Sequence, residues 1–302
     1  MPDGARLCLV GLGNMGLPIG ERFLSAGFRV TGYDVSAAAR ERAQAAGLGV
    51  RGSVTEAAEG ADGVVLVLPN SDVVESVLRD PDVLAVLSPG MTVVDMSSSE
   101  PLRTQALAGE LADRKVRLVD APVSGGVKGA RAGRLTIMAG GSSADLGRVT
   151  PWLEPLGRVV PTGKAGSGHA VKALNNLLSA THLLATSEAM LAGERLGVDP
   201  EVMLSVFNGS SGRSGSTESK FPNFILPRSF DSGFALQLMV KDLRIAVGVA
   251  EAAGAPHALA AATTQMWSEA AQRLGSGADH TEIDRWVRAG EADLPANGPA
   301  SS

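Results

Sequence analysis

A glycine-rich segment directly after the first apolar run constrains the fold more than any other feature of the chain. Residues 6–10 read RLCLV, a buried-strand pattern, and residues 11–16 read GLGNMG and open an amphipathic stretch. In a strand–turn–helix unit, Gly11 permits the tight turn, Gly13 lets the backbone approach a pyrophosphate, and Gly16 permits close helix packing. A plain glycine-rich turn is the alternative, which the position between strand and helix disfavours. The predicted cofactor-binding residues are Gly11, Leu12, Gly13, Asn14, Met15 and Gly16.

Short apolar runs alternate with amphipathic stretches up to residue 163. They lie at residues 28–34, 63–69, 91–97 and 116–122. This βαβα rhythm predicts a parallel sheet covered by helices. Two later runs, RLTIMAGG and GRVVPTG, are candidates to extend the sheet.

Alanine- and leucine-rich segments replace the strand pattern from residue 166 onward. Their apolar periodicity is helical over residues 170–196, 236–253, 257–274 and 281–290. We therefore predict an α/β Rossmann-type N-terminal domain with an all-α C-terminal domain. The expected bounds are 1–164 for the NAD-binding domain, 165–292 for a helical substrate and oligomerisation domain, and 293–302 for a disordered tail.

Asp34 ends the second apolar run, where a carboxylate accepts hydrogen bonds from both ribose hydroxyls of an adenosine and repels a 2′-phosphate. Val35 and Ser36 follow it instead of an arginine, so the pattern favours NAD and makes NADP the less favoured cofactor. The alternative is an ordinary aspartate that starts the next helix. Leu68 and Pro69 end a later strand, and ligands sit beyond the carboxyl ends of parallel strands, so both are expected near the cofactor.

Lys172 lies on an apolar helix pattern one turn before Asn176, in the segment GSGHAVKALNN. Residues four apart on a helix leave the same face, so both side chains can reach one bound molecule. An earlier segment, DAPVSGG, places Ser124 beside Gly125 and Gly126. Consecutive backbone amides and a hydroxyl at this point can hold a carboxylate, although a flexible surface loop is the alternative.

Transfer of a hydride from an alcohol to a nicotinamide leaves a proton that needs a nearby base. Lys172 can accept this proton when it is neutral and can return it, as an ammonium, in the reverse direction. A histidine base is the alternative, but the four histidines are interpreted as structural or surface residues. No His, Cys and Asp cluster has metal-ligand spacing, so no metal is expected.

Composition narrows the possible partners and location. The formal net charge is −5 and no basic patch is evident, which argues against a nucleic-acid partner. Cys8 is the only cysteine, so no disulfide forms within the chain and a cytosolic setting is favoured. No apolar run approaches the roughly 18 residues of a membrane span, and no signal-peptide pattern opens the chain. We expect a cytoplasmic protein without a membrane partner.

These motifs together resemble the β-hydroxyacid dehydrogenase family, which includes 3-hydroxyisobutyrate dehydrogenase and tartronate semialdehyde reductase. GLGNMG, DMSSS, DAPVSGG, GSGHAVKALNN and VKDLRIA occur in family order over nearly the whole chain. The resemblance implies that Lys172 is catalytic, that Asn176 binds substrate beside it, and that Ser124, Gly125 and Gly126 bind the substrate carboxylate. It also implies that Ser98 and Lys241 contact the cofactor.

The resemblance implies an NAD-dependent oxidoreductase that interconverts a small 3-hydroxy acid and its semialdehyde. The alternatives are an imine reductase-like enzyme and a non-catalytic NADH-sensing protein. Residues 208–224 form a polar, glycine-rich stretch that departs from the pattern of both named enzymes. Such loops often line sites, and Arg213 in this loop is a candidate substrate-binding residue. By analogy the helical domain is expected to form a homodimer or homotetramer.

Overall fold

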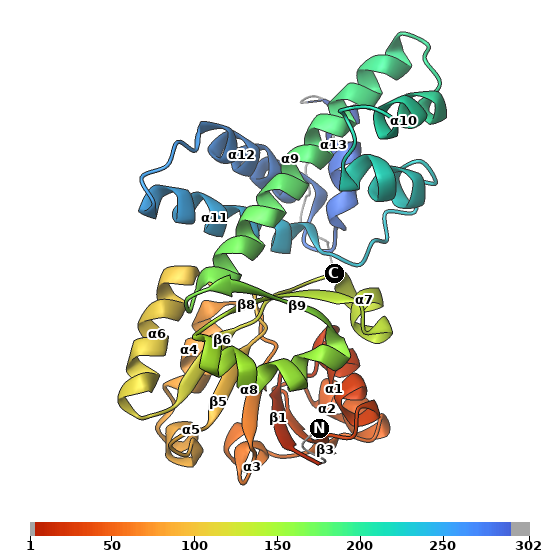
Figure 1. Ribbon diagram of the computed structural model, residues 1–302. Coiled ribbons are helices and arrows are strands. Elements are labelled where there is room, and N and C mark those ends of the chain that lie inside the picture. Colours follow the sequence, from red (N-terminus) through yellow and green to blue (C-terminus); the bar gives the residue numbers. More distant parts are fainter. Residues whose placement is uncertain (1–3, 291–302) are drawn as a thin grey trace, which may run out of the picture. The chain divides into compact units, whose positions relative to one another are not determined.

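The computed structural model describes residues 4–290, so the predicted disordered tail lies outside the described residues. The chain divides into two compact units, of which the first ends at Lys172 and the second starts at Ala173. Figure 1 shows the elements of both. The domain boundary predicted between residues 164 and 165 stays a prediction.

Within residues 4–172, the first unit is built on a nine-stranded sheet. Its strands are β1 (Arg6–Val10), β2 (Arg29–Tyr33), β3 (Gly49–Val50), β4 (Gly63–Leu66), β5 (Thr92–Asp95), β6 (Arg117–Asp120), β7 (Val123–Ser124), β8 (Leu135–Gly140) and β9 (Gly157–Gly163). The sheet has the order β3-β2-β1-β4-β5-β6-β8-β7, with β9 on β8. The first six strands are parallel, as predicted.

The two late apolar runs do extend the sheet, but not in parallel with its centre. β8 pairs antiparallel with β6 and β7, and β9 then pairs parallel with β8. A parallel sheet needs a long crossover between neighbouring strands. Only two residues separate β6 from β7, and a short helix separates β7 from β8, so the chain reverses direction here.

Helices cover both faces of this sheet because the strand side chains alternate between the faces. Leu7 and Leu9 of β1 belong to one apolar core, whereas Cys8 and Val10 belong to another. Cys8 is fully buried in this second core, and burial raises the pKa of its thiol to about 12. The helices are α1 (Gly16–Ser25), α2 (Ala37–Ala45), α3 (Val54–Ala58), α4 (Ser71–Leu78), α5 (Pro81–Val86), α6 (Pro101–Asp113), α7 (Gly126–Ala132), α8 (Ser143–Leu153) and the 3₁₀ helix η1 (Glu154–Leu156).

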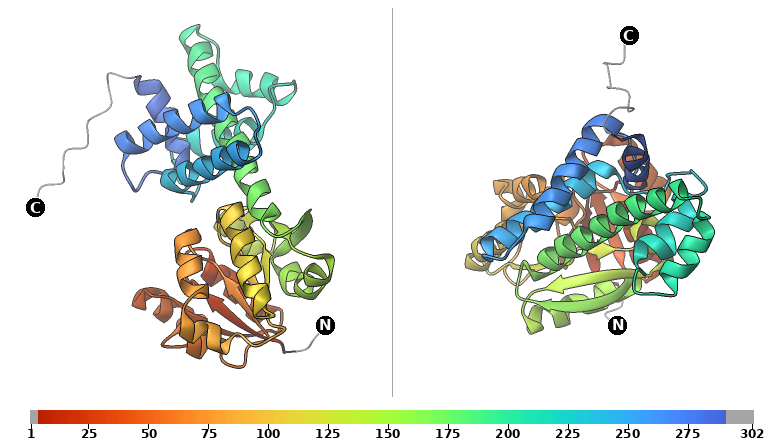
Figure 2. Two further views of the ribbon diagram at one scale, coloured as in Figure 1. Left: turned by 90° about the vertical axis from the view of Figure 1, so that its left-hand side faces the viewer. Right: turned by 90° about the horizontal axis from the view of Figure 1, so that it is seen from above.

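The named elements of the second unit, within residues 173–290, are helices. The long helix α9 (Ser167–Arg195) starts in the first unit and continues into the second. The other elements are α10 (Pro200–Asn208), η2 (Ser216–Ile225), α11 (Leu236–Ala252), α12 (Ala258–Leu274), η3 (His280–Glu282) and α13 (Ile283–Ala289). α11 and α12 lie side by side, as both views of Figure 2 show. The core of this unit contains Trp267, Phe221 and Leu243, all fully buried. The fold class is therefore the predicted one.

The polar stretch expected as a loop is in large part the π-helix η2. Phe221 and Ile225 are four residues apart and both are buried in the helical core, which holds the segment down. Its start is fixed by Ser214 and Thr217, whose side chains and backbones exchange hydrogen bonds. No helix of the part that the structure describes is long and apolar enough to cross a membrane.

Candidate functional site

The glycine turn between β1 and α1 has the geometry that the sequence predicts. Gly11 has φ +94°, and a Cβ on it would lie 2.2 Å from the carbonyl oxygen of Val67. A Cβ on Gly16 would lie 1.8 Å from the carbonyl oxygen of Gly11, so no side chain fits at either position. Gly13 differs, because a Cβ there would meet no heavy atom within 4 Å. The space above Gly13 is open, as close approach of a pyrophosphate requires.

Helix α1 begins at this turn without a side-chain cap. Its N-cap residue, Met15, makes no capping hydrogen bond, and no acidic side chain lies in the first turn. The amino end of a helix favours negative charge through its free amides and dipole. The turn and the start of α1 therefore fit a dinucleotide phosphate.

Asp34 follows β2, and its carboxylate is held by two backbone amides. Oδ2 accepts from the amide of Leu12 at 2.7 Å, and Oδ1 accepts from the amide of Ser36 at 2.8 Å. Sequence reasoning missed Arg40, whose guanidinium donates to the Asp34 carbonyl at 2.6 Å and lies over the ring of Tyr33. Arg40 lies one helical turn beyond Ser36, whereas the sequence prediction of NAD rested on Val35 and Ser36 alone.

The loops after β4 and β5 are joined by Ser97, which Asp95 holds in place. Ser97 accepts from the amide of Leu68 through Oγ and donates its own amide to Asp95. Ser99 donates its hydroxyl to Asp95, so it does not cap α6, whose N-cap is Glu100. Ser98 is the least buried of the three serines. These hydrogen bonds therefore fix the backbone around Leu68 and Ser98, the predicted cofactor contacts.

The segment predicted to hold a carboxylate lies where β7 meets α7. Ser124 ends the strand, and Gly125 and Gly126 follow with φ +127° and +62°. Both glycines are exposed, and α7 begins there without a side-chain cap. The backbone amides at this junction are thus on the surface, where a ligand can reach them.

Asp120, the last residue of β6, anchors the start of α9. Its Oδ1 accepts from the amide of Gly166 at 2.6 Å and its Oδ2 from the amide of His169 at 2.9 Å. Gly168 is required there, because a Cβ on it would lie 2.2 Å from the carbonyl oxygen of Met138. Asp120 is fully buried, and this burial raises the pKa of its carboxyl group. The first turn of α9 is therefore fixed one turn before Lys172, which is partly buried.

Lys172 and Asn176 lie on one continuous helix, as predicted. The amide nitrogen of Asn176 donates to Oδ2 of Asp242 on α11 at 2.6 Å, and both side chains are buried. Asp242 also has its Oδ1 at 3.5 Å from the ammonium of Lys241. The bond between Asn176 and Asp242 was not predicted, since its partners are 66 residues apart in the chain.

Arg213 and Lys220 both come from the polar stretch but differ in their surroundings. Arg213 is exposed and pairs with Glu218, with its Nη2 at 2.6 Å from Oε1. Lys220 is partly buried over the ring of Phe224, and this burial lowers its pKa. His280 is buried near Lys220, and burial lowers the pKa of its ring to about 4. In residues 4–290 no group of three or more His, Cys, Asp or Glu side chains could hold a metal ion.

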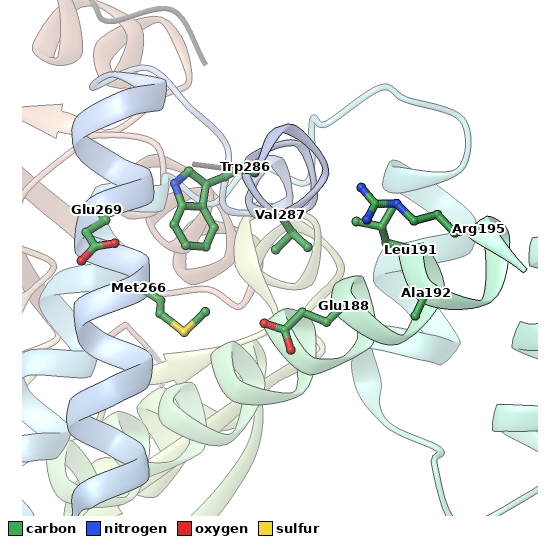
Figure 3. Close-up of a pocket in the computed structure, with 9 residues that line it drawn as sticks. Glu188, Leu191, Ala192, Arg195, Met266, Glu269, Trp286 and Val287 are labelled. Atoms are coloured by element: carbon green, nitrogen blue, oxygen red, sulfur yellow. The ribbon is translucent and has the colours of Figure 1, made fainter. Parts of the chain in front are cut away.

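A pocket of about 430 Å³ lies in the second unit, between α9, α12 and α13 (Figure 3). The Trp286 indole lies between Glu269 and Met266 of α12 and Glu188 of α9. The full lining consists of Glu188, Leu191, Ala192, Arg195, Met266, Glu269, Trp286, Val287 and Gly290. None of these is a predicted site residue. The candidate site therefore rests on the glycine turn and on the first turns of α9, whereas this pocket lies at the other end of that helix.

Two family models match the chain in succession. Residues 6–166 match the NAD binding domain of 6-phosphogluconate dehydrogenase. Residues 166–287 match the domain described as NAD-binding of NADP-dependent 3-hydroxyisobutyrate dehydrogenase.

Relatives and solved structures agree with these models. The chain is 36% identical to 2-(hydroxymethyl)glutarate dehydrogenase of Eubacterium barkeri, over 92% of each chain. It is 35% identical to the NAD-dependent L-serine dehydrogenase of Pseudomonas aeruginosa, over 82% of this chain and 86% of that one. A structure of Mycobacterium tuberculosis 3-hydroxyisobutyrate dehydrogenase with L-serine has a TM-score of 0.89 at 32% identity, and covers 95% of this chain and 100% of that chain.

Proposed function

The chain belongs to the β-hydroxyacid dehydrogenase family of oxidoreductases. From that premise we propose that it uses NAD to oxidise a 2-substituted 3-hydroxypropionate to its semialdehyde, with Lys172 as general base. One observation carries this proposal. Lys172 follows a helix turn anchored by the buried Asp120, and it precedes Asn176, whose amide is fixed by Asp242. A lysine and an amide held one turn apart can act on one hydroxyl.

The substrate class follows from what the relatives' named substrates share. 3-Hydroxyisobutyrate, serine and 2-(hydroxymethyl)glutarate all contain a CH₂OH group on the carbon that bears the carboxylate. They differ only in the second group on that carbon, which is a methyl, an ammonium or a propionate chain. We infer that this chain acts on the common skeleton, and that the second group distinguishes its own substrate.

Each residue has a role that its surroundings support. The open space above Gly13 and the uncapped start of α1 suit the pyrophosphate, and Asp34 suits the ribose of NAD. NAD supplies the hydride acceptor when bound. Cofactor contacts are proposed for Gly11, Leu12, Gly13, Asn14, Met15, Gly16, Asp34, Leu68, Pro69, Ser98 and Lys241.

On the substrate side, Ser124, Gly125 and Gly126 are proposed to bind the carboxylate, because they lie at a strand–helix junction where both glycines are exposed. Asn176 orients the hydroxyl, and neutral Lys172 takes its proton as the hydride leaves. Arg213 stays a candidate for the second group on the substrate, although Glu218 balances its charge. The reverse reaction uses the same lysine as its acid.

The substrate class is tested by NAD reduction with the three acids named above and with lactate, which carries its hydroxyl on the carbon next to the carboxylate. At least one of the three is expected to give steady NADH formation, and lactate to give none. A higher kcat/KM for lactate than for all three would overturn the proposed skeleton. NADH binding without turnover of any of these acids would favour a sensing protein instead.

The role of Lys172 as a base is tested by Lys172→Arg. Arginine keeps the positive charge but does not lose its proton in proteins. If Lys172 removes the hydroxyl proton, kcat for oxidation falls by about 100-fold or more. If Lys172 serves only to attract the carboxylate, Lys172→Arg retains the wild-type rate, and the proposed mechanism is wrong.

We also propose that the chain forms a homodimer or homotetramer through its helical unit. Large apolar side chains are exposed on the helices and loops of this unit, among them Leu178, Leu196, Val202, Val206 and Leu259. Val202 and Val206 lie one turn apart on the same side of α10, and contiguous exposed apolar surface is typical of interaction sites. Sedimentation at micromolar concentration is expected to show a dimer or a larger species, and a monomer alone would contradict the proposal.

A further inference from the structure

His169 is a buried polar residue to which the proposed mechanism gives no role. Its ring is fully buried one helical turn before Lys172. Nδ1 lies 2.9 Å from Oγ1 of Thr104. Nε2 lies 3.7 Å from Oδ2 of Asp95 and has no hydrogen-bond partner among residues 4–290. Buried polar atoms of proteins nearly always have a partner, so an atom without one points to a role for the ring.

On the Nε2 side, the ring faces the residue that fixes the proposed cofactor loops. Oδ1 of Asp95 accepts from the amide of Ser97, and Oδ2 accepts from the hydroxyl of Ser99. Ser97 in turn accepts from the amide of Leu68. The carboxylate of Asp95 therefore holds the loop after β5, and through Ser97 this loop is bonded to the loop after β4.

On the other side, His169 belongs to the anchored start of α9. Its amide donates to Oδ2 of Asp120, the carboxylate that also accepts from the amide of Gly166. Asp95 and Asp120 are paired neighbours at the ends of β5 and β6, and the imidazole lies within 4 Å of both carboxylates. The His169 ring thus lies between Asp95, which holds the loop after β5, and the start of α9, the helix that carries Lys172.

The proton positions follow from the acceptors around the ring. An unprotonated Nε2 would direct its lone pair at the carboxylate of Asp95, which repels it. A hydrogen on Nε2 faces that carboxylate instead. On the Nδ1 side, the Thr104 hydroxyl donates to the carbonyl oxygen of Glu100 at 3.1 Å and lies 2.9 Å from the ring nitrogen.

We propose that His169 is a positioning residue: its Nε2–H faces Asp95 and sets Lys172 relative to the cofactor loops. The inference rests on the proposed function, in which Lys172 is the acid and base of hydride transfer. Reacting groups must be placed closely, and a displacement of about 1 Å can lower a rate about 100-fold. Loss of the Nε2 contact should therefore reduce kcat, while the glycine turn still binds the dinucleotide.

His169→Gln and His169→Met form a matched pair of similar length. Glutamine can place an amide donor near the position of Nε2, whereas methionine places no donor there. We expect kcat of His169→Met to fall about tenfold or more, with the dissociation constant of NADH changed by less than about threefold. His169→Gln should keep kcat within about threefold of the wild type.

Two results would overturn the inference: a wild-type kcat in His169→Met, or an equal loss of kcat in both variants. Should His169→Met not fold, His169→Asn replaces it, because asparagine reaches the Thr104 side but not Asp95. The kcat of His169→Asn is then expected to be about tenfold lower than that of His169→Gln, and equal values would contradict the proposal. Lys172→Ala is measured beside them. If it turns over normally, the proposed function fails; if it is inactive while His169→Met is normal, only the role of His169 fails.

Discussion

Gly13→Ala is expected to weaken NADH binding without lowering stability, and Gly16→Ala is expected to lower the stability of the glycine turn. At Gly13 a new methyl meets no heavy atom within 4 Å, and the residue does not have a positive φ. The free energy of unfolding should therefore be unchanged or higher by about 0.4–1 kcal/mol, since alanine restricts the unfolded chain. The methyl occupies the space into which the pyrophosphate must come. A steric cost of about 2 kcal/mol raises the dissociation constant of NADH about 30-fold.

Gly16→Ala is expected to have the opposite pattern. Its Cβ would lie 1.8 Å from the carbonyl oxygen of Gly11 and 2.8 Å from the carbonyl carbon, both of them backbone atoms. Carbon and oxygen atoms approach to about 3.3 Å, so the turn must open by about 1.5 Å. Overpacking of this kind costs about 1–3 kcal/mol, and we expect a value at the upper end because the backbone cannot rotate away.

Fluorescence titration with NADH and thermal denaturation without cofactor distinguish the two variants. Gly13→Ala should keep the wild-type denaturation midpoint and bind NADH weakly, whereas Gly16→Ala should denature at a lower temperature. Wild-type affinity for NADH in Gly13→Ala would refute the assignment of the open space to the pyrophosphate. A loss of stability in Gly13→Ala equal to that of Gly16→Ala would refute the reasoning from the two environments.

Three further perturbations concern the second unit. Asp242→Ala leaves the buried side-chain amide of Asn176 without its acceptor. The variant should lower the free energy of unfolding by about 1–3 kcal/mol and reduce kcat. Unchanged affinity for NADH is the control. Burial lowers the pKa of His280 to about 4, so the unfolded chain binds its proton at a higher pH than the folded chain does. The free energy of unfolding should then fall by about 1.4 kcal/mol for each pH unit as the pH drops from about 6.5 to about 4, and His280→Gln should flatten this part of the denaturation profile. Arg288→Leu removes the salt-bridge partner of Glu194 and of the buried Asp284. Urea denaturation should show a free energy of unfolding lower by about 2–3 kcal/mol, between the values typical of exposed and of buried salt bridges. An unchanged denaturation midpoint would contradict this.

Local patterns in the sequence predicted the features that depend on neighbouring residues. The glycine turn is local, because Gly11 and Gly16 are fixed by contacts within one strand–turn–helix unit and one adjacent strand. Lys172 and Asn176 share a helix because four-residue spacing is itself a helical property. The alternation of Leu7 and Leu9 with Cys8 likewise divides β1 between the two cores.

The missed features depend on contacts between distant parts of the chain. Asp120 anchors the amide of His169, 49 residues away, and no periodicity indicates such a pairing. The antiparallel course of β8 depends on short connections that the apolar runs alone do not reveal. The π-helix at 216–225 was obscured by serine and glycine in a stretch whose few buried side chains, such as Phe221, hold it in place.

The central claim is that Lys172 transfers the proton during hydride transfer. Its most direct test measures NADH formation by the wild type and by Lys172→Ala, at saturating NAD and the best acid of the three, together with the NADH dissociation constant of each. The kcat of Lys172→Ala is predicted to fall about 100- to 10,000-fold, with NADH affinity within about threefold of the wild type. A kcat within about threefold of the wild type, with NADH still bound, would contradict the claim.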